Sequence, residues 1–221
     1  MSGSMVFHID VNSAFLSWEA VYRVQYLGGN LDLRTIPSAV GGDISKRHGI
    51  ILAKSIPAKK YNIQTGEPVV DALRKYPDLV LVPPNYELYE KNSKAFMAIL
   101  RKYSDKVEQY SIDEAFMDMT GTQILFGVPV IAANAIKDEI YQTLGFTVNV
   151  GVSTNKLLAK MASDFKKPNL VHTLFPHEIE KEMWPLPVRD LFFVGGASEK
   201  KLHSLGIRTI VMMPLCKKVA Y

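Results

Sequence analysis

The sequence predicts an α+β fold in which one sheet carries helices and a large insertion. Apolar, strand-like runs alternate with amphipathic helical segments in the order strand, helix, insertion, helix, strand, strand, helix, strand. This order is ferredoxin-like. The chain has 221 residues, of which 48% are hydrophobic, so it can bury a substantial core.

A strand and a helix begin the pattern. Residues 5–11 are nearly all apolar, which is typical of a strand that is covered on both faces. Asn12 or Ser13 can cap the helix that follows, and Gly28-Gly29-Asn30 ends it. Residues 35–83 are short segments broken by glycine and proline, so we predict a small irregular subdomain there.

The remaining elements complete the order. The pattern predicts a helix over 86–103, strands over 107–111 and 115–119, a helix over 131–144, a strand over 147–152 and a helix over 155–165. The last helix is expected to be capped by Ser153 or Thr154. The two middle strands form a hairpin with Asp113-Glu114 near its tip. This tip lacks the Asn-Gly or Asp-Gly that short hairpins favour, so other contacts must enforce its geometry.

Three carboxylates follow strand-like runs: Asp10 after the first, and Asp113 and Glu114 in the hairpin. An isolated Asp after a strand is more often a turn or cap residue, and acidic pairs are common on surface hairpins. Here the acidic pair is closely flanked by apolar residues, and the strand end and the hairpin tip can meet in the sheet. Carboxylates brought together repel each other unless a divalent cation lies between them. The pattern therefore predicts Mg²⁺ and phosphate chemistry.

Positive charge is concentrated in the C-terminal third. Residues 151–221 carry 11 Lys and Arg against 6 Asp and Glu, whereas residues 1–150 carry 15 against 16. This asymmetry favours a bound polyanion, although a solvated basic surface is an equally good interpretation.

Two lysine groups are candidates for binding phosphate. Lys156, Lys160 and Lys167 are spaced so that they face away from the apolar side of the last predicted helix, if the helix extends that far; an ordinary amphipathic helix gives the same pattern. Pro168 ends this helix and leaves Lys167 where it can reach a phosphate. The run Lys54–Lys60 is a basic loop that could bind a triphosphate if it faces the metal site.

Several classes of protein are disfavoured by composition. No apolar run approaches the ~20 residues that cross a bilayer. The start, Met1–Ser4, lacks the features of a signal peptide and resembles a cloning remnant ahead of a native Met5. The single cysteine, Cys216, excludes an internal disulfide framework and a cysteine-rich zinc site, which is consistent with a reducing cytoplasm.

Three segments together resemble the Y-family of translesion DNA polymerases (DinB/UmuC-like, ImpB/MucB/SamB). The similarity extends from Met5 to about Ile207. The segments that carry it are His8-Ile9-Asp10-Val11-Asn12-Ser13-Ala14-Phe15, Tyr110-Ser111-Ile112-Asp113-Glu114-Ala115-Phe116, and residues 151–169, which include Asn155-Lys156-Leu157-Leu158-Ala159-Lys160-Met161-Ala162-Ser163-Asp164 and Lys166-Lys167-Pro168-Asn169.

The resemblance implies a polymerase built like a right hand. It assigns residues 5–24 and 84–170 to the palm, 25–83 to small fingers, and 171–221 to a helical, helix-hairpin-helix-like thumb. The family's C-terminal little finger has no counterpart here, so the resemblance implies an N-terminal catalytic fragment of a longer protein. It also implies cytoplasmic, template-directed DNA synthesis during repair, with primer-template DNA and dNTP as partners and a sliding clamp reached through the missing region.

The resemblance also implies roles for individual residues. It makes Asp10, Asp113 and Glu114 the ligands of two Mg²⁺ ions, helped by the Val11 carbonyl, and it makes Phe15 a steric gate against the ribose 2′-hydroxyl. The other implied contacts are the triphosphate for Lys59 and Lys167, and DNA for Lys156, Lys160, Gly195 and Gly196.

The chain departs from the family pattern in places. Ile56-Pro57-Ala58-Lys59 replaces a common Tyr-Glu-Ala-Arg, so a tyrosine hydroxyl is lost and a bidentate arginine becomes a lysine. Phe193-Val194-Gly195-Gly196 replaces the thumb's usual Pro-Gly-Ile-Gly turn. These changes favour one alternative, a catalytically impaired module that binds DNA or a partner.

A second alternative is a haloacid-dehalogenase-type phosphatase. Asp10-Val11-Asn12-Ser13 loosely resembles the Asp-x-Asp-x-Thr start of those enzymes. Their mechanism needs a second acid two residues after the first, and Asn12 cannot donate a proton as a carboxylic acid does.

Overall fold

A five-stranded sheet is the centre of the molecule. The structure, a computed structural model, describes residues 3–42 and 49–213. The strands lie in the order β5-β6-β1-β7-β8. Their bounds are β1 Val6–Val11, β5 Val107–Gln109, β6 Glu114–Asp118, β7 Val148–Ser153 and β8 Val171–Thr173. β1 is antiparallel to both β6 and β7, and β8 is parallel to β7. The predicted α+β class and ferredoxin-like order are confirmed; β8, which falls in the segment assigned to the thumb, was not predicted.

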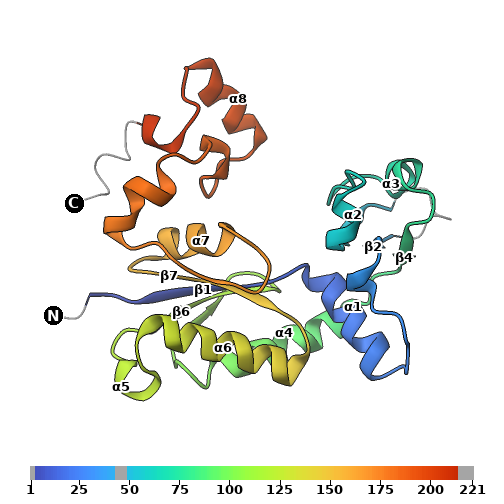
Figure 1. Cartoon of the computed structure of the whole chain (residues 1–221), viewed down its shortest axis with the longest axis horizontal. Helices are drawn as coiled ribbons and strands as arrows, with labels where there is room; N and C mark the ends of the chain where they lie inside the picture. The colour runs from blue at the N-terminus through green and yellow to red at the C-terminus, as the bar shows by residue number, and fades with distance from the viewer. Residues whose placement is uncertain (1–2, 43–48, 214–221) are drawn as a thin grey trace.

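Helices cover both faces of this sheet (Figure 1). One face packs against α4 (Tyr86–Leu100) and α6 (Pro129–Leu144), and the other against α7 (Lys156–Asp164). Helix α1 (Ala14–Gln25) lies beyond the end of the sheet, against α4 and the insertion. The alternation along β1 explains the two layers, because Phe7 and Ile9 point into the large apolar core while His8 and Asp10 point toward α7. Among the described residues, no helix is long and apolar enough to cross a membrane.

Helix α7 lies unusually close to the sheet at Gly151. A Cβ atom on Gly151 would collide with the carbonyl oxygen of Ala159 and lie 2.5 Å from the backbone nitrogen of Ser163. The absence of a side chain at this point of β7 therefore sets the depth at which α7 packs. The predicted caps of this helix are wrong by one or two residues, because Asn155 accepts the hydrogen bond from the backbone of Leu158 at 2.9 Å.

The hairpin tip is held by contacts outside the turn itself. The backbone N–H of Val11 donates to the carbonyl of Asp113 at 3.0 Å, so β1 fixes the tip directly. Ser111 Oγ donates to the Asp113 carboxylate at 2.7 Å. These contacts fix the geometry of the tip in place of a favoured turn sequence. The expectation that other contacts must enforce it, because the tip lacks Asn-Gly or Asp-Gly, agrees with this. The second strand starts at Glu114, one residue earlier than predicted.

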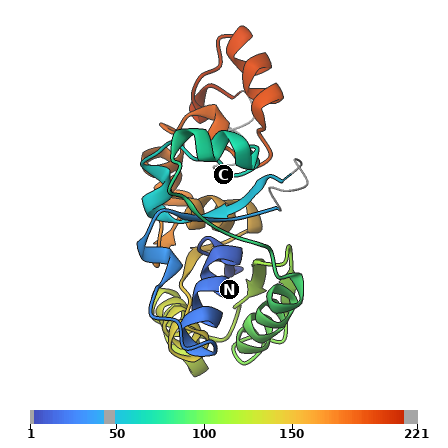
Figure 2. The same cartoon turned by 90° about the vertical axis from the view of Figure 1, so that its right-hand side faces the viewer.

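The insertion forms a small sheet rather than an irregular subdomain. Its strands lie in the order β3-β2-β4, and its helices are α2 and α3. The bounds are β2 Ser38–Gly41, β3 Ile51–Lys54, β4 Val80–Val82, α2 Ile56–Lys59 and α3 Val69–Lys75. A separate apolar core supports it, made of Ala39, Ile51, Ala58, Ile63, Val69, Ala72 and Leu79. Strands of three or four residues are too short for a periodic pattern, which is why they were missed. Figures 1 and 2 show this unit above α1.

The C-terminal segment packs on α7. Leu158, Met161 and Ala162 of α7 share an apolar cluster with Leu174, Ile179, Met183 and Ile210. The segment contains α8 (Gly196–Ser204) and several short helical turns, at Pro176–Glu178, Ile179–Met183, Val188–Asp190 and Ile210–Met212. A short helix, α5 (Gln123–Phe126), precedes α6. Cys216 and the start of the proposed cloning remnant lie outside the described residues.

Candidate functional site

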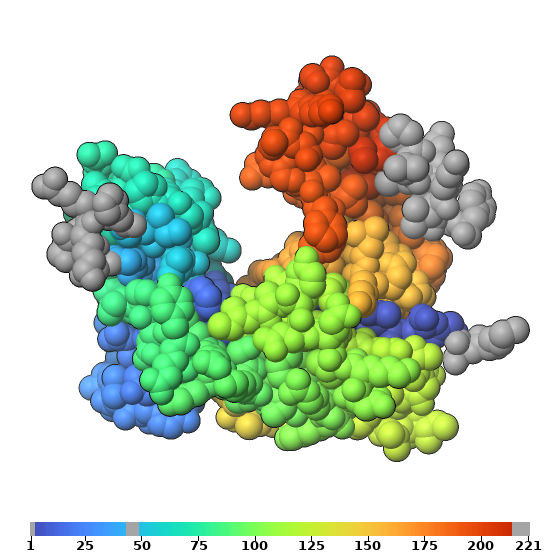
Figure 3. All heavy atoms as spheres, turned by 180° about the vertical axis from the view of Figure 1, so that it is seen from behind, coloured from blue at the N-terminus to red at the C-terminus, as the bar shows by residue number. Residues whose placement is uncertain are grey.

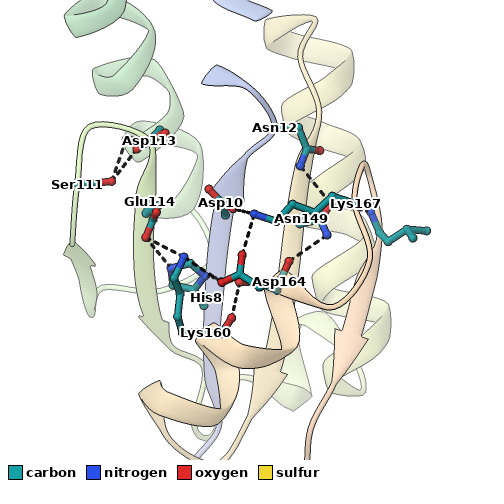
Figure 4. A network of polar contacts seen from close by, with 12 residues as sticks. His8, Asp10, Asn12, Ser111, Asp113, Glu114, Asn149, Lys160, Asp164 and Lys167 are labelled. Carbon is teal, nitrogen blue, oxygen red and sulfur yellow. Dashed lines mark hydrogen bonds and ion pairs between the residues drawn. The ribbon is translucent and has the colours of Figure 1, made fainter. Parts of the chain in front are cut away.

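The sheet brings Asp10 and Glu114 together at one edge. They are register partners across β1 and β6, at the end of β1 and the start of β6. Asp113 precedes Glu114 and its carbonyl is bound by Val11, so all three predicted acidic residues come from one corner of the sheet. Asp10 is only 6% exposed. Figure 4 shows the three carboxylates and their neighbours.

All three carboxylates line one cavity of about 520 Å³ between the large sheet and the small one. The other predicted residues that line it are Val11, Phe15, Lys59, Lys160 and Lys167. The space-filling view in Figure 3 shows a wide hollow between the small sheet and the C-terminal segment, above the large sheet. Lys156, Gly195 and Gly196 do not line the cavity.

Two lysines of the cavity, one in α7 and one just after it, are paired with carboxylates. Lys167 Nζ contacts the carboxylate of Asp10 and lies 2.8 Å from Asp164 Oδ1. Lys160 Nζ lies 3.2 Å from Glu114 Oε2 and 3.5 Å from Asp164 Oδ2. Lys160 is 8% exposed, so the expectation that it faces away from the buried side of its helix is wrong. Its ammonium group offsets the negative charge of the acidic corner and does not lie on a solvated surface.

These partners and burial shift the pKa values in opposite directions. Burial raises the pKa of Asp10, and the nearby Lys167 only partly offsets it. The His8 imidazole, helped by Lys160, holds the pKa of Glu114 at about 2. Burial acts to lower the pKa of Lys167, but the Asp10 and Asp164 carboxylates raise it overall. The site is therefore a compact arrangement of alternating charges.

The small sheet contributes two further ammonium groups on the opposite wall. Lys54 ends β3 and Lys59 ends α2, whose first turn is capped by Ser55. Lys54 Nζ donates to the carbonyl of Ile63 at 2.5 Å, and burial and the neighbouring Lys59 lower its pKa. Among the described residues, all the carboxylates of the cavity thus lie on the wall formed by the large sheet and α7, together with Lys160 and Lys167, and the small sheet adds only ammonium groups. This arrangement suits a polyanion bound through metal ions on one side.

Phe15 forms a rigid apolar wall of the same cavity. Its ring stacks on Tyr89 with a centroid distance of 4.5 Å and an interplanar angle of 11°. The Tyr89 hydroxyl donates to Glu19 Oε1 at 3.0 Å, which fixes the ring on which Phe15 stacks. A stacked ring in a fixed position can exclude a substituent by shape alone.

The residues present suit Mg²⁺, because they offer carboxylate oxygens and because the backbone places them around one cavity. Three carboxylates face one cavity, and Mg²⁺ prefers carboxylate oxygens together with phosphates and water. Over residues 3–42 and 49–213, however, no three His, Cys, Asp or Glu side chains are grouped closely enough to hold an ion as they stand. Asp10 and Glu114 contact Lys167, Lys160 and His8 instead. Metal binding therefore requires these carboxylates to exchange at least part of their contacts.

The remaining predicted DNA contacts lie away from the cavity. Lys156 is exposed and pairs with Glu108 of β5. Gly195 caps α8 and Gly196 is its first residue. A Cβ atom on either glycine would meet nothing within 4 Å, so the chain's own packing does not require glycine there.

Two site residues were not singled out from the sequence, whereas Lys54 belongs to the basic run that was a candidate for binding phosphate. Asp164 lies within a quoted motif, but a surface role is the default for such a side chain. His8 precedes Asp10 by two residues, so the strand period of two places it on the same face of β1. That period was the one available signal.

Asn12 has a structural role that argues against the phosphatase interpretation. Its amide donates to Asn149 Oδ1 at 3.2 Å, and its oxygen accepts from the backbone of Asn169 at 2.9 Å. Both ends of the side chain are thus engaged in joining β1 to β7 and to the loop after α7.

Comparisons with known proteins agree with the fold and with the family that the motifs resemble. Residues 9–164 match the impB/mucB/samB family, and residues 176–207 match the helix-hairpin-helix motif of the same family. DNA polymerase IV of Clostridium acetobutylicum is 50% identical over 207 residues, which cover 93% of this chain and 52% of that protein. DNA polymerase IV of Acetivibrio thermocellus is 41% identical, over 96% of this chain and 51% of that protein.

Solved structures give the same result. DinB from Sulfolobus solfataricus superposes with a TM-score of 0.81 at 31% identity, over 93% of this chain and 58% of that one. Dbh DNA polymerase in an insertion ternary complex superposes with a TM-score of 0.81 at 30% identity, over 93% of this chain and 58% of that one. The chain spans about half the length of the curated relatives it matches. The Y-family resemblance of the motifs is confirmed, and the chain belongs to the impB/mucB/samB family.

Proposed function

We propose that the chain catalyses template-directed addition of a dNTP to a primer 3′-hydroxyl, with two Mg²⁺ ions held by Asp10, Asp113 and Glu114. The observation that carries the proposal is the placement of these carboxylates in one cavity opposite Lys54 and Lys59. The relatives named DNA polymerase IV, and a relative solved as a ternary complex, support it. Low-fidelity translesion synthesis in the cytoplasm, with help from a sliding clamp, is the biological role proposed with it.

Each side chain has a defined task in this proposal. Asp10, Asp113 and Glu114, with the Val11 carbonyl, would hold the ions at the end of the rigid sheet. Bound Mg²⁺ would lower the pKa of the primer hydroxyl and neutralise charge on the α-phosphate and on the departing pyrophosphate. Lys59 and Lys167 would contact the triphosphate. Lys167 can do so because its contact with Asp10 lies on the cavity wall, where a phosphate can replace the carboxylate as its partner.

A titration of the chain with dNTP in the presence and absence of Mg²⁺ tests the proposal. Heat released on dNTP binding should require Mg²⁺, because the carboxylate wall alone repels a triphosphate. Binding of primer-template DNA without any Mg²⁺-dependent dNTP binding would instead support the alternative, a catalytically impaired DNA-binding or partner-binding module.

Replacing Lys59 by methionine is expected to raise the KM for dNTP about tenfold or more with little change in kcat, because it removes one charged contact to the triphosphate. The matched control is Lys60→Met, at the adjacent exposed residue, which does not line the cavity. Steady-state kinetics of single-nucleotide addition compare the two. Equal effects of both variants would show that bulk positive charge matters, and not Lys59 itself.

Replacing Phe15 by alanine is expected to reduce discrimination against ribonucleotides about 10- to 100-fold, because space opens beside the sugar. Competition between a ribonucleotide and the matching deoxyribonucleotide measures it. Tyr22→Ala is the control, since Tyr22 is on the same helix but stacks on Tyr26, away from the cavity. Unchanged discrimination in the Phe15 variant would remove the gate from the proposal.

A further inference from the structure

A histidine lies buried beneath the acidic corner. His8 is 0% exposed and occupies β1 two residues before Asp10, on the face that α7 covers. Burying an imidazole is costly unless its nitrogens find partners. The packing here does not require one, because the neighbouring ring of Phe116, 4.6 Å away between centroids, would contact an aromatic hydrocarbon equally well. The polar atoms of His8 therefore need a separate explanation.

The ring joins α7 to Glu114. Its Nδ1 lies 2.8 Å from Ser163 Oγ, and its Nε2 lies 3.3 Å from Glu114 Oε2 (Figure 4). Ser163 Oγ also lies 2.8 Å from the carbonyl oxygen of Lys160, which is a second possible acceptor for its one hydrogen. The side chain thus spans the space between a helix and the first residue of β6, and touches no solvent.

The two contacts differ in what they ask of the ring. A carboxylate oxygen can only accept, whereas a serine hydroxyl can donate or accept. The ring tautomer that suits both neighbours therefore carries its hydrogen on Nε2, on the side of Glu114, and accepts at Nδ1 from Ser163 Oγ.

The contacts of Glu114 with His8 and Lys160 both involve Oε2 and leave Oε1 without either partner. Oε2 is buried, with His8 Nε2 at 3.3 Å and Lys160 Nζ at 3.2 Å. Within the described part of the chain, neither His8 Nε2 nor Glu114 Oε2 has a hydrogen-bond partner in this arrangement, so the two atoms form a close polar contact at 3.3 Å. Because Oε2 is inaccessible while the side chain remains 20% exposed, Oε1 is the oxygen that Glu114 can offer to the cavity.

We propose that His8, supported by Ser163, is a positioning residue that holds Oε2 of Glu114 and thereby directs Oε1 to the metal site. This inference rests on the proposed function, because it concerns the same site. Outer partners of ligating groups commonly change metal affinity by about 10- to 100-fold when they are removed. A rigid carboxylate loses less conformational freedom when it binds an ion, and His8 supplies that rigidity from within the core.

Mn²⁺ binding to the chain, measured by electron paramagnetic resonance in the presence of dNTP, tests the inference without relying on activity. His8→Phe keeps the ring volume but has no N–H, and it should weaken Mn²⁺ binding about 10- to 100-fold. His8→Gln can place an amide N–H where Nε2 lies, and it should recover most of the affinity. Ser163→Ala keeps the imidazole but removes the hydroxyl that contacts Nδ1, and its Mn²⁺ affinity should lie between those of the two His8 variants. Thermal unfolding of each variant, followed by circular dichroism, reports stability separately.

The outcomes separate this inference from the proposed function. Wild-type chain that binds no Mn²⁺ overturns both. Wild-type chain that binds Mn²⁺ while His8→Phe binds it equally well overturns only the role of His8. Equal losses in His8→Phe and His8→Gln, in step with their melting temperatures, also overturn it, because they indicate a packing role. Should His8→Phe not fold, Ser163→Ala decides: weaker Mn²⁺ binding supports the inference and unchanged binding overturns it.

Discussion

Replacing Asp113 by asparagine is expected to reduce primer extension on the order of a thousandfold while the fold stays intact, because a metal-held charge contributes several kcal/mol to the transition state. Asparagine keeps the shape and the oxygen that accepts from Ser111 Oγ, at 2.7 Å in the structure. The bond from the Val11 N–H to the carbonyl of residue 113 involves only backbone. The substitution thus removes a charge and little else. Rapid-quench measurement of single-nucleotide addition at saturating DNA gives the rate.

Asp118→Asn is the matched control for this variant. Asp113 precedes β6 and Asp118 ends it; Asp118 pairs with Lys106 at 3.5 Å and does not line the cavity. Its loss should leave the rate of addition essentially unchanged, because exposed pairs contribute little. Comparable rate losses in both variants would contradict the assignment of Asp113 to the metal site.

Replacing Gly151 by alanine is expected to lower the free energy of unfolding by about 3 kcal/mol, at the upper end of overpacking costs. The added Cβ would collide with the backbone of α7 at Ala159 and Ser163, and backbone cannot move aside as a flexible side chain does. Any outward shift of α7 would also displace Lys160 from Glu114, so activity should fall with stability. Urea denaturation measures the loss of stability.

Gly195→Ala provides the comparison. A Cβ there meets nothing within 4 Å, and the backbone at Gly195 has φ −87°, which any residue adopts. The free energy of unfolding should change by no more than about 0.5 kcal/mol. A Gly151→Ala variant as stable as Gly195→Ala would mean that α7 does not pack on the sheet as described.

The longer strands of the large sheet were predictable from their residue types. Residues 5–11 are nearly all apolar and residues 147–152 are rich in valine, and the hairpin between them pairs with the first strand. The three-residue edge strand β8 was not predicted. The small sheet was not predictable in the same way. Its three- and four-residue strands show no usable period, and its core forms only when segments distant in sequence meet, such as Ala39 and Leu79.

The acidic residues were predictable, but their partners were not. A carboxylate at the end of a strand has a defined place once the sheet forms, so Asp10, Asp113 and Glu114 could be brought together from the pattern alone. The place of Lys160 depends instead on how closely α7 approaches the sheet. That approach is set by Gly151, a tertiary contact that helical periodicity does not contain. For this reason Lys160 was assigned to DNA and lies against Glu114.

Mg²⁺-dependent addition of a single template-matched dNTP to a labelled primer, with the chain in excess over the DNA, tests the central claim most directly. The account predicts that the primer grows by one nucleotide with release of pyrophosphate, that EDTA stops the reaction, and that a mismatched dNTP is added far more slowly. No extension with excess chain and saturating Mg²⁺, or extension that EDTA does not stop, would contradict it.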